Sequence, residues 1–372
     1  MIYANEFFQI FSKQQINMFV GVPDSLLSEL NKYLSNNSEA EYVVTANEGN
    51  AVAYAVGYYL SSKKIPVVFM QNSGIGNAVN PILSLAEETI YDIPMIFIVG
   101  WRGKPDELDA VQHRKQGEVT IPLLNMLGIA TIIIDKNLSE QEIISTINKV
   151  ILDVRKYNKK IAIIISKDVF QKEKQLIKKE EKYPLSCREA LDIIHKKINK
   201  AIVVITTGMI SREWFDIQEK VKGKQIKDIY NIGAMGHANQ IALGIAKNVR
   251  NQNVYCIDGD GAFLMHMGGI AYIAMSKCKN YKHILLNNGV HATVGGETTA
   301  GFYSNLSNVA LACGYKKVFT VETQEELERT IEVMNDVDGP ALLEVKINEK
   351  INKNVPRISI STLSIKEKFM QY

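Results

Sequence analysis

Short runs of apolar, mostly β-branched residues alternate with longer segments of helical periodicity along this chain. Apart from single polar residues at their starts, such as Glu41 and Lys160, the runs are apolar and do not alternate with polar positions. Such runs predict parallel strands buried on both faces, because helices cover both faces of a parallel sheet. In the first half of the chain we expect strands at Met18–Val20, Glu41–Val44, Pro66–Met70, Met95–Val99, Thr131–Ile134 and Lys160–Ile165.

The second half of the chain repeats this alternation. Helices are expected at Asn239–Lys247, His266–Ser276 and Gln324–Met334. The pattern predicts an α/β fold made of two doubly wound parallel-sheet domains, with no obvious sequence repeat between them. The expected strands are Ala201–Ile205, Gln225–Ile229, Val254–Ile257, His283–Leu286 and Ala341–Val345, of which the second is the weakest because Lys227 and Asp228 interrupt it.

A highly charged segment separates the two halves of the chain. Gln171–Lys182 holds eight charged residues of twelve, and Pro184 follows. We therefore predict a first domain over residues 1–170, a charged linker over 171–184 and a second domain over 185–372. A charged surface helix within one domain is the alternative interpretation.

Length and composition narrow the class of protein. A chain of 372 residues suits two ordinary domains, and a formal charge of +3 gives no basis for wholesale nucleic-acid binding. The amino terminus lacks a signal-peptide pattern, and no apolar run approaches a bilayer span, so we expect a cytoplasmic protein without a membrane partner. The absence of a CxxC pair favours buried free thiols over disulfides or a zinc site at Cys187, Cys256, Cys278 and Cys313.

The strongest chemical motif follows two consecutive predicted strands. Gly259-Asp260-Gly261 ends one strand and Asn287-Asn288 ends the next. Because neighbouring parallel strands end at the same edge of a sheet, the oxygens of Asp260 and Asn288 are expected to reach one site. Mg²⁺ prefers oxygen ligands that it shares with phosphate, and glycines let the backbone approach a diphosphate. Amides of a helix beginning near Ala262 can face such an anion.

Other interpretations of the Gly-Asp-Gly motif exist. An EF-hand loop would need oxygen ligands where Ala262 and Leu264 stand. A dinucleotide fingerprint would need a glycine in place of Leu264. A purely structural turn is the remaining alternative, and the Asn-Asn pair at the next strand end argues against it.

Gly259-Asp260-Gly261, a 25-residue spacer and Asn287-Asn288 resemble the cofactor motif of thiamine-diphosphate enzymes. The resemblance implies that Mg²⁺ is held by Asp260, Asn288 and the main-chain carbonyl of Val290. It implies a first domain that binds the aminopyrimidine ring, a second that binds the diphosphate, and no middle domain. The other residues expected to bind the cofactor are Thr207, Gly208, Gly233, Met235, Gly259, Gly261 and Ala262, with Met235 supporting its bent shape.

The segment Asn47-Glu48-Gly49-Asn50-Ala51 resembles the glutamate segment of the same family. The resemblance implies that Glu48 donates to N1′ of the aminopyrimidine ring and so promotes loss of the thiamine C2 proton. Glu48 must then exchange a proton near neutral pH, and burial raises a carboxyl pKa in that direction. The alternative is that Glu48 only caps the helix after it.

Over nearly its whole length the chain resembles small two-domain members of this family, the phosphonopyruvate decarboxylases and the related sulfopyruvate decarboxylases. Two departures leave the 3-substituent of the substrate open. Ala110-Val111 stands where Glu-Pro is usual, and Glu297-Thr298 stands where Gln-Pro is usual. The segments that carry the resemblance include Gly21–Ser25, Asn47–Ala51, Met70–Gly74, Gly76–Pro81, Gly100–Gly103, Gln112-His113, Gln116-Gly117, Gly236–Ala238, Met265–Gly268 and Val294–Gly296.

The resemblance implies decarboxylation of a small anionic 2-oxo acid, best matched by phosphonopyruvate, which would give phosphonoacetaldehyde and CO2. Beside Glu48, His113 and His291 are the candidates for proton transfer, whereas His195 and His283 are interpreted as structural. An anionic substituent needs charged and neutral hydrogen-bond donors. The expected substrate contacts are Asp24, Ser25, Asn72, Ser73, Arg102 and Gln116.

Alternatives to this function stay open at the sequence level. Sulfopyruvate is a second substrate candidate, and a thiamine-dependent carbon–carbon ligase is a second type of reaction. A non-catalytic phosphate-binding regulator is a third interpretation, but such a protein would not need the carboxyl group of Glu48. The resemblance also implies a homodimer or higher homo-oligomer with the active site at the subunit interface.

Overall fold

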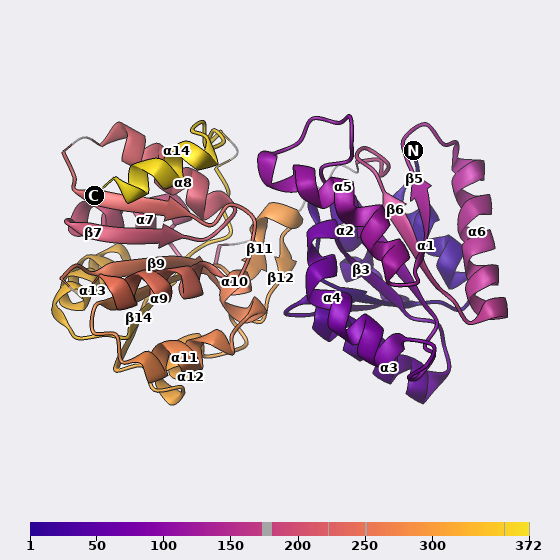
Figure 1. The fold of residues 1–372 in the computed structure, drawn as a ribbon, viewed down its shortest axis with the longest axis horizontal. Coiled ribbons are helices and arrows are strands. Elements are labelled where there is room, and N and C mark those ends of the chain that lie inside the picture. Colours follow the sequence, from indigo (N-terminus) through magenta and orange to yellow (C-terminus); the bar gives the residue numbers. More distant parts are fainter. Residues whose placement is uncertain (173–180, 222, 250, 353, 372) are drawn as a thin grey trace. The chain divides into compact units, whose positions relative to one another are not determined.

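The computed structural model describes residues 1–172, 181–221, 223–249, 251–352 and 354–371 (Figure 1). Residues 173–180 of the predicted charged linker lie outside this part of the chain. The chain divides into two compact units, one formed by Met1–Ile177 with Thr293–Glu297 and the other by Lys178–Ala292 with Thr298–Tyr372. Each unit is an α/β fold with one parallel sheet, which confirms the predicted fold class.

The first unit contains a six-stranded sheet in the order β2-β1-β3-β4-β6-β5. Its strands are β1 Met18–Gly21, β2 Glu41–Val44, β3 Val67–Gln71, β4 Met95–Gly100, β5 Ala130–Ile134 and β6 Lys160–Ile165. Its longer helices are α1 Ala4–Ser12, α2 Ser28–Asn36, α3 Glu48–Ser62, α4 Ile75–Pro81, α5 Val111–Met126 and α6 Glu140–Tyr157. Short helical turns lie at η1 Ser25–Leu27, η2 Asn72–Gly74 and η3 Ile82–Ala86.

Side chains at alternate positions along each strand pack into two separate hydrophobic cores of the first unit. Val67 and Phe69 of β3 pack with α1, α2 and α6, whereas Val68 and Met70 pack with α3, α4 and α5. Successive side chains of a strand point to opposite faces, so a strand covered on both sides must be apolar throughout. This is the physical reason why the continuous apolar runs mark strands in this chain.

The second unit also contains a six-stranded sheet, in the order β13-β14-β10-β9-β7-β8. Its strands are β7 Ala201–Ile205, β8 Ile226–Tyr230, β9 Val254–Gly259, β10 Tyr281–Asn287, β13 Lys317–Val321 and β14 Ala341–Lys346. Its helices are α7 Cys187–Lys197, α8 Met209–Lys220, α9 Ala238–Asn248, α10 Asp260–Met265, α11 Gly269–Ser276, α12 Leu306–Ala312, α13 Gln324–Asp336 and α14 Thr362–Met370. The two-residue strands β11 Val290–His291 and β12 Glu297–Thr298 and the turn η4 Ala292–Val294 follow β10, and the segment Thr293–Glu297 among them groups with the first unit.

Every predicted strand is present, with its ends shifted by at most two residues. The strand β13 was not predicted. It lies at the edge of its sheet, and only Val321 among its residues is buried. An edge strand that is covered incompletely does not need a continuous apolar run, so the pattern used for the other strands misses it. The predicted helix at His266–Ser276 begins at Gly269 instead.

Each sheet has a topological switch point, where the connections from two neighbouring strands run in opposite directions along the sheet. In the first unit it falls between β1 and β3, and in the second between β7 and β9. Loops after the two strands that flank such a switch point diverge and leave a crevice, where α/β sheets commonly bind ligands. A ligand site is therefore expected at the segments that follow Gly21, Gln71, Ile205 and Gly259.

All four cysteines are free, as predicted. Cys187 and Cys256 are buried, whereas Cys278 and Cys313 are half-buried.

Among the residues that the structure describes, none of the helices combines the length and the apolar character that crossing a membrane requires.

Candidate active site

Asp260 is the first residue of α10, directly after β9, and its side chain is held out of water with 3% exposed. Burial raises the pKa of this carboxyl to about 6, although Thr299 and the backbone N–H groups of Gly261 and Asn288 donate hydrogen bonds to it. A buried carboxylate with only neutral donors is under-compensated. A divalent cation would supply the missing positive charge, so the carboxyl fits a metal site.

The loop after β10 brings Asn288 next to Asp260, because β9 and β10 pair in parallel. Asn288 is half-buried, and its Oδ1 accepts a hydrogen bond of 3.1 Å from the Val290 N–H. Asn287 has a different role. Its Nδ2 donates to the Gly301 carbonyl at 2.8 Å and to Glu344 Oε1 at 2.7 Å, so this buried amide ties the loop to the sheet.

Gly261, Met235 and His291 converge beside Asp260. A Cβ atom at Gly261 would lie 2.7 Å from His291 Cε1 and 3.3 Å from Met235 Cε, so a side chain at this position does not fit. Desolvation lowers the pKa of His291 to about 4, so its imidazole is neutral at physiological pH. The side chain of Asn231 braces the loop that carries Met235, because it accepts from the Ala234 N–H at 3.2 Å and donates to the Ala234 carbonyl.

The remaining expected cofactor residues surround the same end of the second sheet. Thr207 Oγ1 donates to the Ile232 carbonyl at 2.7 Å and joins the loop after β7 to the loop after β8. Gly208 has a φ of +95°, which favours glycine, and precedes α8, whose first amides can face an anion. Gly259 ends β9, Ala262 is buried in α10, and Gly233 is exposed beside Met235.

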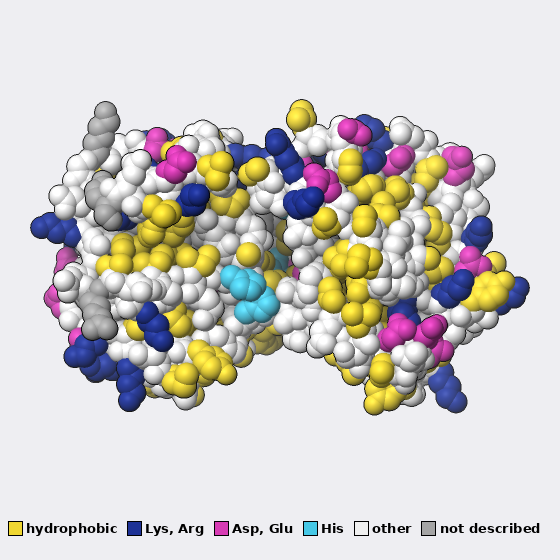
Figure 2. All heavy atoms as spheres, in the orientation of Figure 1, with side chains coloured by type: hydrophobic (Ala, Val, Ile, Leu, Met, Phe, Trp, Pro, Cys, Tyr) yellow, Lys and Arg dark blue, Asp and Glu magenta, His cyan; other side chains and the backbone are white. Residues whose placement is uncertain are grey.

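Two histidines outside the predicted site lie next to this loop. The rings of His237 and His266 have centroids 4.4 Å apart, and His237 Nδ1 lies 3.1 Å from the Met235 carbonyl. Histidine side chains gather beside α10 on the visible face of the second unit (Figure 2). Burial lowers the pKa of His266, and the neighbouring His237 lowers it further. Both residues belong to segments that carry the family resemblance, which is the signal that could have found them.

Glu48 is the first residue of α3 in the first unit and is 5% exposed. Asn47 caps the helix, since its side chain accepts from the Asn50 N–H at 3.0 Å. Glu48 Oε2 accepts a hydrogen bond of 2.8 Å from Asn77 Nδ2, and the carboxyl packs so closely on Gly74 that a Cβ there would overlap it. Burial raises the pKa of Glu48, as a proton-exchanging role requires.

The guanidinium of Arg102 is largely occupied by other residues of the first unit. Its Nε and Nη2 donate to both carboxylate oxygens of Asp109 at 2.8 and 2.6 Å, and its Nη1 donates to Ser25 Oγ at 2.9 Å. Burial alone would raise the pKa of Asp109, but the hydrogen bonds from Arg102 and the backbone hold it well below the usual range. Asp109 was not predicted, and the structure makes it the main partner of Arg102.

Asp24 and Asn72 lie near Arg102 and are buried. Asp24 caps η1 through the Leu26 N–H at 3.0 Å, and burial raises its pKa to about 6. The amide of Asn72 is fully engaged. It donates to the Arg102 carbonyl at 2.8 Å and to Thr120 Oγ1 at 2.9 Å, and it accepts from the Arg102 N–H. Asn72 therefore positions the Arg102 backbone.

The other expected substrate and proton-transfer residues of the first unit are half-buried. Ser73 Oγ accepts a hydrogen bond of 2.5 Å from Gln71 Nε2. His113 and Gln116 lie on α5, which packs so tightly against Gly103 that a Cβ there would overlap the His113 carbonyl. His195, interpreted as structural, pairs with Gln218 Oε1 at 2.7 Å within the second unit.

The predicted residues thus form two groups, one in each unit. Glu48 and the surroundings of Arg102 belong to the first unit. Asp260, Asn288, Met235 and His291 belong to the second.

Comparisons with known proteins match both units. Residues 1–122 match the family described as thiamine pyrophosphate enzyme, N-terminal TPP binding domain, and residues 207–345 match thiamine pyrophosphate enzyme, C-terminal TPP binding domain. A phosphonopyruvate decarboxylase from Streptomyces viridochromogenes is 27% identical over 96% of this chain and 91% of its own length. A sulfopyruvate decarboxylase from Methanosarcina acetivorans is 24% identical over 98% of this chain and 95% of its own length. The structure of benzoylformate decarboxylase from Polynucleobacter necessarius covers 94% of this chain and 99% of that chain, with 13% identity and a TM-score of 0.37.

Proposed function

The chain belongs to the thiamine pyrophosphate enzymes and is a decarboxylase of that family, and we propose that its substrate is a 3-substituted pyruvate. The best candidate is phosphonopyruvate, which would yield phosphonoacetaldehyde and CO2. The observation that carries this choice is the similarity to a phosphonopyruvate decarboxylase over 96% of the chain. Sulfopyruvate is the second candidate, favoured by the similarity to a sulfopyruvate decarboxylase over 98% of the chain.

We further propose that Mg²⁺ accompanies the cofactor in the second unit. Asp260, Asn288 and the carbonyl of Val290 would hold the ion, with the diphosphate completing its oxygen ligands. The buried, under-compensated carboxyl of Asp260 supports this, because a cation removes the cost that raises its pKa to about 6. When bound, thiamine diphosphate supplies an electron sink for the electron pair left by the departing CO2.

The diphosphate would lie against backbone amides at two helix starts. Gly208 precedes α8, and Gly259 and Gly261 flank the start of α10. Met235 would pack against the cofactor rings, since it lies beside Gly261 in a loop that Asn231 braces. An unbranched thioether fills such a gap well.

Glu48 would hold and exchange a proton at N1′ of the aminopyrimidine ring. Its burial raises the pKa, so that the carboxyl keeps a proton at a higher pH than an exposed glutamate does. The hydrogen bond from Asn77 fixes Oε2 and leaves Oε1 for this exchange. His291, neutral because of desolvation, is the candidate in the second unit for donating to or accepting from the substrate.

Arg102 would set the preference for an anionic substituent. Three of its N–H groups are engaged by Asp109 and Ser25, so its plane is fixed before a substrate arrives. A preorganised guanidinium loses little conformational entropy when it binds an anion. Asp109 would act here as a positioning residue that also moderates the positive charge.

We also propose that the chain acts as a homodimer or a larger homo-oligomer whose active sites lie at subunit interfaces. Glu48 and Asp260 belong to different units, and under this proposal both would contact the same cofactor. Large apolar side chains are exposed on and after α3 and α4 of the first unit, as an interface would require. They are Tyr54, Leu60, Leu83, Ile90 and Tyr91.

A steady-state comparison of phosphonopyruvate, sulfopyruvate and pyruvate tests the substrate proposal. The protein is supplied with Mg²⁺ and thiamine diphosphate, and CO2 release is measured for each acid. We expect the highest kcat/KM with phosphonopyruvate. A higher kcat/KM with sulfopyruvate would make sulfopyruvate the first candidate and phosphonopyruvate the second. Product formation only after addition of an acceptor aldehyde would replace decarboxylation by carbon–carbon ligation.

A further inference from the structure

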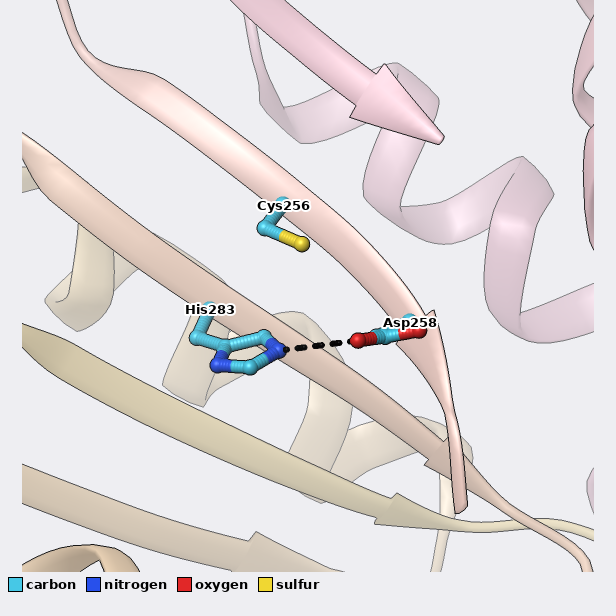
Figure 3. Close-up of side chains that lie close together, drawn as sticks. All are labelled: Cys256, Asp258 and His283. Atoms are coloured by element: carbon cyan, nitrogen blue, oxygen red, sulfur yellow. Dashed lines mark ion pairs between the residues drawn. The ribbon is translucent and has the colours of Figure 1, made fainter. Parts of the chain in front are cut away.

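Three fully buried side chains meet in the core of the second unit, on the two strands whose ends carry Asp260 and Asn288. Cys256 and Asp258 lie two residues apart on β9 and so face the same side of the sheet. His283 lies on β10 and pairs in register with Cys256. The sulfur, carboxylate oxygen and imidazole nitrogen of this cluster all lie within 4.8 Å of one another (Figure 3).

The facing atoms of Asp258 and His283 are close enough for an ion pair if the imidazole is protonated, but they form no hydrogen bond (Figure 3). His283 Nε2 lies 3.6 Å from Asp258 Oδ2, which is beyond hydrogen-bond distance. Within the described part of the chain, neither atom has a hydrogen-bond partner, although both side chains are 0% exposed. Buried polar atoms of this kind are rare and destabilising, so their arrangement needs a physical explanation.

Surrounding groups fix the orientation of the cluster. His283 Nδ1 lies 3.2 Å from the Tyr315 hydroxyl, and Asp258 Oδ1 accepts from the Gly259 N–H at 3.1 Å. If Nδ1 carries the imidazole hydrogen, the Nε2 lone pair faces a carboxylate oxygen. If Nε2 carries it, the hydrogen points at an oxygen too far away to accept it. A cation between the two atoms removes the conflict in the first tautomer.

We propose that Cys256, Asp258 and His283 bind a divalent transition-metal ion, with Zn²⁺ as the best match, in a structural site separate from the Mg²⁺ site. Zinc bonds of about 2.1 Å at tetrahedral angles place a nitrogen and an oxygen ligand roughly 3.4 Å apart. The observed 3.6 Å is close to that separation. The mixed sulfur, nitrogen and oxygen set suits zinc and does not suit magnesium, which takes oxygen ligands.

The charges of the three ligands and the hydrogen bond to His283 from its neighbour agree with this assignment. A thiolate, a carboxylate and a neutral imidazole balance the two positive charges of the ion, so the buried cluster has no net charge. Binding releases the thiol proton of Cys256 to solvent as the sulfur–metal bond forms. The contact from Tyr315 to His283 is the outer-shell hydrogen bond that metal-binding histidines usually have. The hydroxyl of Tyr281 borders the site, since it contacts Cys256 and donates to the Asn239 carbonyl at 3.2 Å.

The ion would join β9 to β10 through side chains in addition to their backbone pairing. These strands end at Gly259 and Asn287, immediately before Asp260 and Asn288. A structural ion here would hold those two residues at a fixed separation. The site escapes a motif search because its ligands come from two strands, with spacings that differ from the paired cysteine and histidine spacings of common zinc motifs.

Metal analysis of the untagged protein tests the proposal. The chain is refolded with Zn²⁺, dialysed against a mild chelator and measured by plasma mass spectrometry. We expect about one zinc ion per chain, and retention of that ion in the Asp260→Ala variant, which lacks the Mg²⁺ ligand. Cys256→Ser should lose the ion, whereas Cys313→Ser, which changes a cysteine outside the cluster, should keep it.

Cobalt provides a readout that does not depend on a variant folding. Refolding of the unaltered chain with Co²⁺ should produce the sulfur-to-cobalt charge-transfer band of a thiolate ligand, and Zn²⁺ should raise the Tm relative to refolding with chelator. The absence of both effects, together with no bound zinc, would overturn the proposal and leave a bare histidine–aspartate pair. Zinc that persists in Cys256→Ser but is lost in Asp260→Ala would place the ion in the Mg²⁺ site and equally overturn it.

Discussion

Among the carboxyl groups buried in the described part of the chain, Asp24, Glu48 and Asp260 are each surrounded differently. Asp24 accepts from backbone amides beside Arg102, Glu48 accepts from the Asn77 amide, and Asp260 accepts from Thr299. Burial raises the pKa of all three. A fold does not gain stability by burying charged groups without ionic partners, so the placement of Glu48 and Asp260 is best explained by the cofactor they would contact.

Glu48→Gln tests the role of the first-unit carboxyl. Glutamine keeps the shape and the contact with Asn77 but cannot exchange a proton with the aminopyrimidine ring. We expect turnover to fall by on the order of a hundredfold or more, the range of general acid–base catalysis, with cofactor affinity largely kept. Turnover and calorimetric cofactor binding measure the two effects. Near-normal turnover would restrict Glu48 to a structural role at the start of α3.

Asp260→Ala tests the metal site. The variant removes the carboxylate proposed as an Mg²⁺ ligand, so Mg²⁺-dependent binding of thiamine diphosphate should be lost in calorimetry. Cofactor affinity that stays normal in this variant would contradict the assignment. Ala also removes a buried polar group, so the variant is checked for its fold by its Tm.

The raised pKa of Asp260 predicts how the unaltered chain responds to pH. With a pKa of about 6, the cofactor-free carboxyl is mostly protonated at pH 5 and mostly ionised at pH 7. A proton competes with Mg²⁺ for this oxygen, so the apparent Mg²⁺ affinity should rise as pH increases through about 6. Titrations with Mg²⁺ at a fixed cofactor concentration measure this. An affinity that is flat across pH 5 to 7 would argue against Asp260 as ligand.

Arg102→Ala tests substrate preference. We expect the KM for an anionic 3-substituted pyruvate to rise much more than the KM for pyruvate, because a charge-assisted contact contributes about 1.5–3 kcal/mol. Asp109→Asn should cause a smaller rise with the same selectivity, since it loosens Arg102 without removing it. Lys104→Ala is the matched control, because Lys104 is a cation in the same loop that pairs with Glu107. If Arg102→Ala raised the KM of both substrates equally, Arg102 would contribute to folding and not to substrate preference.

At the residue scale, the sequence is informative where one motif carries the chemistry. Asp260, Asn288 and Glu48 stand in segments with a recognisable order of residue types. Thr299 and Asp109 do not, because their roles depend on tertiary contacts. Asn77 lies in the segment Gly76–Pro81 that carries the resemblance, but its hydrogen bond to Glu48, 29 residues away, could not be read from that segment. Arg102 was predicted as an anion contact, but its pairing with Asp109 could not be read from the chain.

At the scale of elements, the apolar runs predict strands well where helices cover both faces. They fail at β13, which lies at an edge and is mostly uncovered. They also do not locate helix starts accurately, as the first residue of α11 shows. Helix starts depend on capping contacts, and several helices of this chain begin with a side chain that accepts a backbone N–H, such as Asn47 before α3.

Asn47→Ala tests the link between the start of α3 and catalysis. Loss of the cap should lower the free energy of unfolding by about 1 kcal/mol. It should also lower kcat, because Glu48 is the first residue of the helix that Asn47 caps. Chemical denaturation and turnover measure the two effects.

Ser139→Ala is the matched control for this variant. Ser139 caps α6, away from Glu48, by accepting from the Glu142 N–H. The Ser139→Ala variant should lower the free energy of unfolding by a similar amount and leave kcat unchanged. A parallel loss of kcat in both variants would mean that reduced stability, and not the position of Glu48, explains the effect of Asn47→Ala.

At the scale of the whole molecule, the distribution of functional residues over two units leads to the last prediction. Chains carrying Glu48→Gln and chains carrying Asp260→Ala should each be inactive. If each site takes its first unit from one subunit and its second from another, a mixed dimer has one site with both changes and one with neither. We therefore expect about half of normal activity per heterodimer after subunit exchange.

Native mass spectrometry identifies the heterodimers in this experiment, and CO2 release measures their activity. Confirmed heterodimers with no recovered activity would show that each site is built within one chain. The division into two domains was visible in the sequence, but the segment Thr293–Glu297, which groups with the first unit, has no marker in the pattern of residues. Its grouping depends on packing, which local sequence does not encode.

The order of strands in the two sheets bears on the ancestry of the chain. Numbered within its own unit, the first sheet runs 2-1-3-4-6-5, and the second, taken from its β8 edge, runs 2-1-3-4-6-5 as well. Many other orders of six parallel strands obey the same rules of handedness and connection. Identical order in both halves therefore points to duplication of one ancestral gene, followed by divergence that erased the sequence repeat. The two copies would then have diverged in the residues that follow their strands, with Glu48 after a strand of the first sheet and Asp260 and Asn288 after strands of the second.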